Sequence, residues 1–199
     1  MIVKADYYEE LQLLIEELKK FKIQVEFYNE ASEFADIGEL VNRKILLNSN
    51  TRDNLSLIFI IGHLFGHYVQ FHQFEKYKNL VETVLAPKPL ILSDEFKQSF
   101  FEYELEAFRI GKYLIQKKLP FTKIIETKYQ VFLNTDFDLF WKYLTTGKKT
   151  SAEDFKNKLE LNELNVNKNL IPIEPLSYKE NFSFLNNIDE TDFLKIKVV

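Results

Sequence analysis

The sequence has no cysteine, and it has only three histidines and five glycines among its 199 residues. The absence of cysteine excludes disulfide bonds, thiolate metal ligands and a cysteine nucleophile. A transition metal in this protein must therefore be bound by imidazole nitrogen and by oxygen. The formal net charge of −4 does not provide the basic surface that nucleic-acid binding requires, so we expect no nucleic-acid partner.

The chain also lacks the pattern of a signal peptide or a membrane span. Its first residues, MIVKADYYEE, place acidic side chains ahead of any apolar run, which predicts a cytoplasmic protein. The segment from Asn54 to Phe74 has no charged residue and is long enough to compare with a membrane helix. Histidines, glutamines, Ser56 and two glycines interrupt it, and no cationic flank marks an orientation. We interpret the segment as a fully buried core helix and expect no membrane partner.

Hydrophobic residues make up 46% of the chain, which is enough for a continuous core. Apolar spacing and turn residues predict an α+β fold with a small N-terminal sheet and a series of helices. The predicted elements are a helix over 5–21, a strand over 23–28, a hairpin of 35–41 and 43–48, a central helix over about 52–73 capped by Ser49 or Asn50, a loop at 86–89, a long helix over 93–119 capped by Ser93, and one or two helices within 121–146.

The composition changes after residue 150. The following stretch is rich in asparagine, and the prolines at 172 and 175 interrupt any helix there. We therefore predict a domain over 1–150 and a C-terminal extension over 151–199. The extension is expected to contain one helical region and to end in the strand-like FLKIKVV.

All three histidines lie in IIGHLFGHYVQFH, residues 60–72. His63 and His67 are four residues apart, which places both imidazoles on one helix face, about 5–6 Å apart at Cβ, where they can share a metal ion. His72 lies off that face, which favours a surface or structural role. A simpler interpretation of the pair is two core histidines in a buried helix. Gly62 and Gly66, next to the pair, favour close packing over the approach of a partner's backbone.

A zinc ion bound by two histidines needs a third protein ligand from another part of the chain. The long helix over 93–119 offers three candidates in EYELEAF: Glu102, Glu104 and Glu106. Residues two apart on a helix do not face the same direction, so Glu104 and Glu106 cannot both face the histidines. Glu104 is the preferred ligand and Glu106 the second choice.

The order of these parts resembles the ImmA/IrrE family of metallopeptidases. In that family a hairpin is followed by a helix with H-E-x-G-H and then by a helix with E-x-E-A; here the matching stretches are KILLNSNTRDNLSLIFIIGHLFGHYV and EYELEAFRIGKYLIQKKLP, within residues 5–146. The resemblance implies a zincin-like fold, with a small twisted sheet packed on the central helix. It also implies zinc bound by His63, His67 and Glu104.

Two residues depart from the family pattern. Leu64 stands where the family has the glutamate that acts as general base, and leucine cannot accept or deliver a proton. Phe108 replaces a polar residue four positions after the third ligand, where an outer partner of the metal site would lie. We therefore predict a catalytically impaired, metallopeptidase-like protein without meaningful proteolysis. The resemblance implies a regulatory or binding role, with a transcriptional repressor as a protein partner.

Two further functions are consistent with the same residues. The first is an active zinc-dependent peptidase in which another carboxylate, such as Glu102, has replaced the missing base. The second is a metal-free scaffold in which residues 151–199 fold across the old cleft. A metal between His63, His67 and Glu104 would argue against the scaffold.

Overall fold

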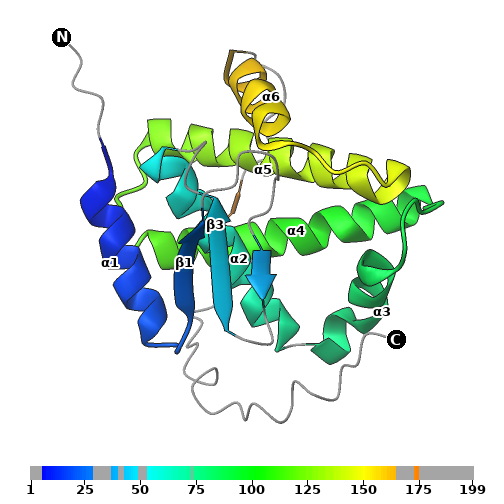
Figure 1. The fold of residues 1–199 in the computed structure, drawn as a ribbon, viewed down its shortest axis with the longest axis horizontal. Coiled ribbons are helices and arrows are strands. Elements are labelled where there is room, and N and C mark those ends of the chain that lie inside the picture. The colour runs from blue at the N-terminus through cyan, green and yellow to red at the C-terminus, as the bar shows by residue number, and fades with distance from the viewer. Residues whose placement is uncertain are drawn as a thin grey trace.

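A computed structural model of the chain describes residues 6–28, 37–39, 43–48, 53–72, 74–164 and 173–174. Within these residues a small sheet and a set of helices form an α+β structure, which confirms the predicted class (Figure 1). The elements are α1 Tyr8–Lys19, β1 Gln24–Tyr28, β2 Ile37–Glu39, β3 Lys44–Asn48, α2 Asn54–Phe71, α3 Phe74–Leu85, α4 Asp94–Ile115, α5 Lys123–Thr146 and α6 Ala152–Leu164.

The sheet has the strand order β1-β3-β2. β1 pairs with β3 in parallel, whereas β2 pairs with β3 in the antiparallel direction, with Ile37 opposite Leu46. The antiparallel pair confirms the predicted hairpin for the described residues of β2 and β3. Ile45 and Leu47 of β3 are buried, because alternate residues of a strand point to the same face. That face packs in the main core, where α2 contacts β2 and β3.

The central helix α2 is apolar on almost every side and is buried along most of its length. It begins at Asn54, and the side chain of Asp53 accepts a hydrogen bond of 2.8 Å from the backbone N–H of Ser56. The prediction of Ser49 or Asn50 as the cap was therefore wrong. An aspartate satisfies a free N–H of the first turn and also places a negative charge at the positive end of the helix. Among the described residues, none of the helices combines the length and apolar character needed to cross a membrane.

The helices α2 and α4 cross at unusually short range, and glycine makes this possible. A Cβ atom on Gly66 would lie 2.1 Å from the carbonyl oxygen of Ala107, and one on Gly111 would lie 2.5 Å from the carbonyl oxygen of Gly62. The close-packing interpretation of Gly62 and Gly66 is confirmed. With no Cβ on these residues, the two backbones approach closely, and α4 is held against one face of α2.

The helices after α2 follow the prediction in part. α4 is capped by Ser93 as predicted, and residues 123–146 form the single helix α5, which ends at Gly147 in the left-handed conformation. The helix α3 was not predicted. In the region after residue 150, α6 packs on α5, and Phe155 and Ile173 lie in the main core. Residues 165–172 and 175–199, including the strand predicted at FLKIKVV, lie outside the described residues.

Candidate metal centre

His63 and His67 of α2 converge with Glu104 of α4. The Nε2 atoms of the two histidines are 3.0 Å apart. Glu104 Oε2 lies 3.2 Å from Nε2 of His67 and 3.4 Å from Nε2 of His63. Glu104 is 2% exposed and His63 is 8% exposed, so the group is enclosed by protein on most sides. Among the described residues, these three form a group that could hold a metal ion.

The separations within this group suit a tetrahedral ion. Zinc binds imidazole nitrogen and carboxylate oxygen at about 2.0–2.2 Å, so two ligand atoms of one tetrahedral zinc lie about 3.3–3.5 Å apart. The three observed separations differ from that value by at most a few tenths of an ångström. In addition, Oε1 of Glu104 is buried without a hydrogen-bond partner. A buried carboxylate oxygen with no donor is costly, and a cation beside it would remove that cost. The residues present therefore fit a divalent metal ion.

Gln70 fixes the orientation of the His67 ring. The side-chain N–H₂ of Gln70 donates to the backbone carbonyl of Tyr103 at 2.8 Å and to Glu106 at 3.3 Å. Its oxygen must then face His67, whose Nδ1 lies 3.0 Å away and donates to it. With the proton on Nδ1, the lone pair of His67 is on Nε2, the atom that faces His63 and Glu104. Metal-binding histidines in general have such an outer partner, which sets the tautomer.

His63 has a different environment from His67. Its Nδ1 is buried and has no hydrogen-bond partner, while the ring of Phe108 packs against its imidazole with centroids 4.2 Å apart. Phe108 thus supplies an apolar contact and no acceptor for Nδ1. His67 therefore has a polar outer partner, whereas the neighbour of the His63 ring is the apolar ring of Phe108.

The two imidazoles also differ in their proton affinity. Burial lowers the pKa of His63 well below its ordinary value, and the neighbouring His67 lowers it further. Burial acts in the same direction on His67, but the carboxylate of Glu104, with contributions from Gln70 and Asp136, raises the pKa of His67 above its ordinary value. His63 is therefore ready to bind a metal as a neutral ligand, whereas a metal must displace a proton from His67 at acidic pH.

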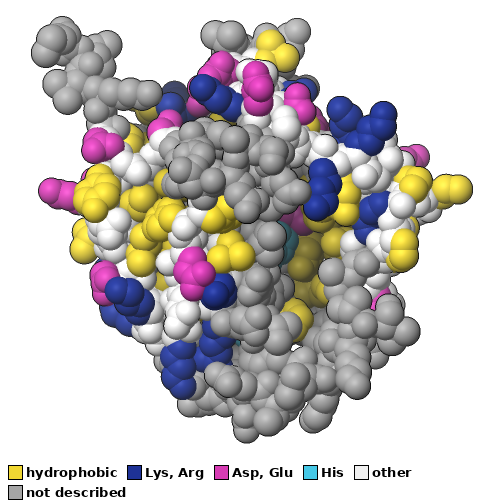
Figure 2. Space-filling model, in the orientation of Figure 1, with side chains coloured by type: hydrophobic (Ala, Val, Ile, Leu, Met, Phe, Trp, Pro, Cys, Tyr) yellow, Lys and Arg dark blue, Asp and Glu magenta, His cyan; other side chains and the backbone are white. Residues whose placement is uncertain are grey.

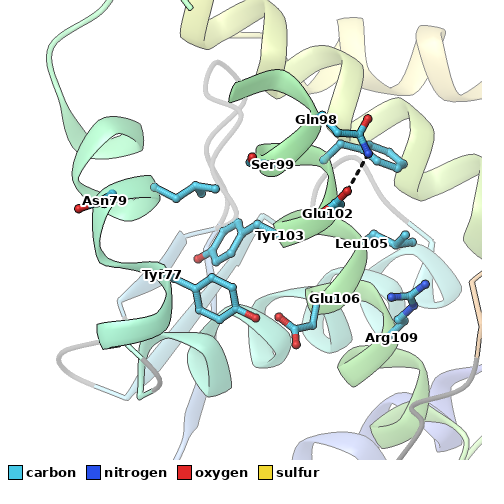
Figure 3. Close-up of a pocket in the computed structure, with 11 residues that line it drawn as sticks. Tyr77, Asn79, Gln98, Ser99, Glu102, Tyr103, Leu105, Glu106 and Arg109 are labelled. Atoms are coloured by element: carbon cyan, nitrogen blue, oxygen red, sulfur yellow. Dashed lines mark hydrogen bonds between the residues drawn. The ribbon is translucent and has the colours of Figure 1, made fainter. Parts of the chain in front are cut away.

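The other predicted acidic residues lie away from the histidine pair. Glu106 accepts a hydrogen bond from Gln70 and so forms part of the outer layer. Glu102 is exposed, accepts a hydrogen bond from Gln98, and lines a cavity of about 810 Å³ between α3 and α4 (Figure 3). Tyr103 contacts Tyr77 at this cavity and His67 on α2, with ring centroids 5.1 and 5.0 Å apart. Glu102 is therefore not placed to act at the histidines.

Leu64, the residue after His63, is a partly buried side chain that packs against the main core. The remaining histidine, His72, ends α2 and packs against Tyr68, with ring centroids 4.7 Å apart. Neither residue offers a group to the metal site. For His72, this agrees with the predicted structural role.

Sequence reasoning missed two residues of the site, Gln70 and Asp136. Asp136 belongs to α5, and its Oδ2 lies 3.3 Å from Nε2 of His63. A signal for it exists in the sequence: Tyr129, Phe132 and Asp136 follow at spacings of three and four, so an acid continues the buried side of this helix. Gln70 carries a similar signal, because it is an amide on a helix that is otherwise buried and apolar.

The metal-binding group is partly accessible, because 16% of the His67 side chain is exposed. Figure 2 shows a histidine and an acidic side chain at the bottom of a hollow, with hydrophobic side chains around it. Two imidazoles and a carboxylate form a donor set that suits zinc and other divalent transition metals.

In comparisons with known proteins, no family model, no curated protein and no solved structure matches this chain, so its resemblance to ImmA/IrrE metallopeptidases rests on the motif residues and their order.

Proposed function

We propose that this protein is a zincin-like, zinc-binding protein that has lost peptidase activity and acts by binding a protein partner. The observation that carries the proposal is the convergence of Nε2 of His63, Nε2 of His67 and Oε2 of Glu104 at separations of 3.0–3.4 Å. An H-x-x-x-H helix with a glutamate from the next long helix is the arrangement of donors in zincin-type peptidases. The small sheet beside α2 supports the same kinship.

The loss of peptidase activity is inferred from the residues around the donors. A bound zinc ion would polarise a carbonyl group, but hydrolysis also needs a group that accepts and delivers protons. General acid–base assistance contributes about 10²–10⁴ in rate. Leu64 cannot supply it, and Glu102 is turned toward Gln98 on the other side of α4. In this proposal the protein retains the metal ligands of a peptidase but lacks the side chain that would transfer protons during hydrolysis.

The proposed partner is a protein segment that enters the hollow seen in Figure 2. The hydrophobic side chains around the hollow would bury apolar surface on contact (Figure 2). The resemblance to ImmA/IrrE proteins suggests a transcriptional repressor as the partner.

Metal analysis of the protein tests this proposal. Wild-type protein purified without added metal should contain about one equivalent of zinc or take it up from solution, whereas His63→Ala and Glu104→Ala should not. His72→Ala is the matched control, because it removes the only histidine that lies outside the group, and it should bind zinc like wild type. Equal zinc binding by wild type and His63→Ala would overturn the proposal.

A cleavage assay tests the loss of activity. Zinc-loaded wild-type protein should leave a helix-turn-helix repressor intact under conditions in which an active peptidase of this type cuts it. Cleavage that a chelator abolishes would contradict the proposal and favour a working hydrolase.

A further inference from the structure

Asp136 reaches the metal-binding group from α5, a helix that carries none of the three donors described above. Its Oδ2 atom lies 3.3 Å from Nε2 of His63, and Oε2 of Glu104 lies 3.4 Å from the same nitrogen. Both distances match the separation of two ligand atoms on one tetrahedral zinc ion, about 3.3–3.5 Å. Asp136 is not in the group of residues whose ligand atoms all lie within 4.8 Å of one another, so its side chain must turn toward His67 and Glu104 when a metal binds. His63 therefore has carboxylate oxygens at ligand–ligand distance from two different helices.

Packing between α4 and α5 holds Asp136 in this position. One and two turns before Asp136, the rings of Phe132 and Tyr129 pack on Phe108, with centroids 5.9 and 5.2 Å apart. The hydroxyl of Tyr129 also donates a 2.9 Å hydrogen bond to the backbone carbonyl of Phe108. Because Phe108 itself packs on the His63 ring, the register of α5 relative to His63 is fixed by buried contacts.

The charges in the group also favour a second carboxylate ligand. Two neutral imidazoles leave the two positive charges of a divalent ion uncompensated, and a single carboxylate cancels only one of them. Glu104 and Asp136 together cancel both, which matters at a site with little solvent around it because buried charges need to be paired. Asp136 is more exposed than Glu104, with 21% and 2% of their side chains accessible.

We infer that Asp136 is a fourth protein ligand, so that the metal site is closed by two histidines and two carboxylates. The inference rests on the metal binding proposed above. It adds that a protein side chain fills the coordination position that a peptidase would leave free for its substrate. Structural zinc sites have four protein ligands, whereas catalytic sites have three and an open position. Asp136 thus occupies the open position, and Leu64 removes the base. Both features assign the metal a structural role.

Cobalt substitution tests this inference, because Co(II) absorbs visible light according to its ligands. Co(II) and Zn(II) affinities are to be measured for wild type, Asp136→Ala and the near-isosteric Asp136→Asn, with Asp138→Ala, an exposed acid on the same helix, as the control. Asp136→Ala should weaken binding by more than about 100-fold, since even an outer partner of a metal site contributes about 10- to 100-fold. The Asp138→Ala control should bind like wild type. Circular dichroism of all four proteins establishes that they are folded.

Azide provides a second readout that a merely structural aspartate would not change. Azide should leave the visible spectrum of the Co(II) form of wild type and Asp138→Ala unchanged, and it should shift the spectrum of Asp136→Ala, in which one coordination position is free. A wild-type spectrum that responds to azide, or equal affinities of wild type and Asp136→Ala, would overturn the fourth ligand and leave the three-residue site in place. Wild-type protein that binds neither metal would overturn the proposed metal site as well.

Discussion

The backbone of Ala107 lies so close to Gly66 that the two residues leave no room for a methyl group between them. A Cβ atom at position 66 would come within 2.6 Å of three backbone atoms of Ala107. Backbone atoms cannot rotate away as a flexible side chain can, so any larger residue at this position must push α4 away from α2. The same contact holds Glu104, one turn earlier on α4, at the histidines of α2.

Gly66→Ala should therefore damage both stability and metal binding. We expect a loss of at least about 1–3 kcal/mol in the free energy of unfolding, the range for overpacked cores. Zinc affinity should fall too, because α4 carries Glu104. Urea denaturation and zinc titration measure the two effects, and Ser99→Ala, at an exposed position of α4, should change neither. A Gly66→Ala protein as stable as wild type would mean that the crossing of α2 and α4 is wider than described.

Gln70→Leu should weaken zinc binding by about 10- to 100-fold, because it removes the acceptor that keeps the proton of His67 on Nδ1. Nitrogen-15 NMR of the imidazoles should also show a shift of His67 toward the other tautomer. Gln98→Leu, an exposed glutamine on α4, is the control and should have no effect on either measurement. Unchanged affinity in Gln70→Leu would show that the His67 ring is oriented by packing alone.

Lys112→Met should lower the free energy of unfolding by about 1–3 kcal/mol, because a buried acceptor loses a charged donor. The Lys112 side chain is 8% exposed, donates to the backbone carbonyl of Ile173 at 2.9 Å, and is paired with Glu126. Lys128→Met removes a lysine whose pair with Glu163 is at the surface, and it should change stability by no more than about 0.5 kcal/mol. Urea denaturation compares the two. Equal stability of both variants would mean that the contact with Ile173 contributes nothing.

Acid should destabilise the protein partly through His72. Burial and the charge of Arg43 lower the pKa of His72 to about 4, below the ordinary value of 6.5. The unfolded state then binds a proton at a higher pH than the folded state does. The contribution of His72 to stability is therefore complete above about pH 6.5 and is lost as the pH falls from there toward 4.

Comparison of His72→Gln with wild type isolates this effect. The free energy of unfolding of wild type should decline more steeply than that of His72→Gln between about pH 6.5 and pH 4. Denaturant unfolding at a series of pH values, with the same buffer and salt, gives both curves. Parallel curves would show that His72 is protonated equally well in the folded and unfolded states.

The sequence predicts the features of this fold that depend on local spacing. The interval between His63 and His67 requires one helix face, Ser93 caps α4 as a serine before an acidic first turn should, and the alternation in 23–28 predicts β1. Glu104 could be preferred over Glu106 only by its place in the family-like motif. In the structure both glutamates belong to the same site: Glu104 contacts His67 directly, whereas Glu106 contacts Gln70, the outer partner of His67.

Features that depend on tertiary contact could not be predicted in the same way. Asp136 is 73 residues beyond His63 in the sequence, and the packing of Tyr129 and Phe132 on Phe108 brings its helix to the histidines. The cap of α2 was misplaced because several polar residues precede the apolar run, and spacing alone does not distinguish Asp53 from Ser49. The helix α3 lies between stronger signals and has a short apolar face, which packs on α4 through Leu80 and Val84 in a cluster around Phe100.

The placement of the three donors on two helices links ion binding to folding. His67 and Glu104 are 37 residues apart, and a fragment containing α2 alone would offer an ion only two imidazoles. Tight binding should then arise only after α2 and α4 have docked, and each ion that binds draws the population toward the docked state by mass action. A zinc ion in this protein would be a cross-link between distant parts of the chain, one that forms only after the core has assembled.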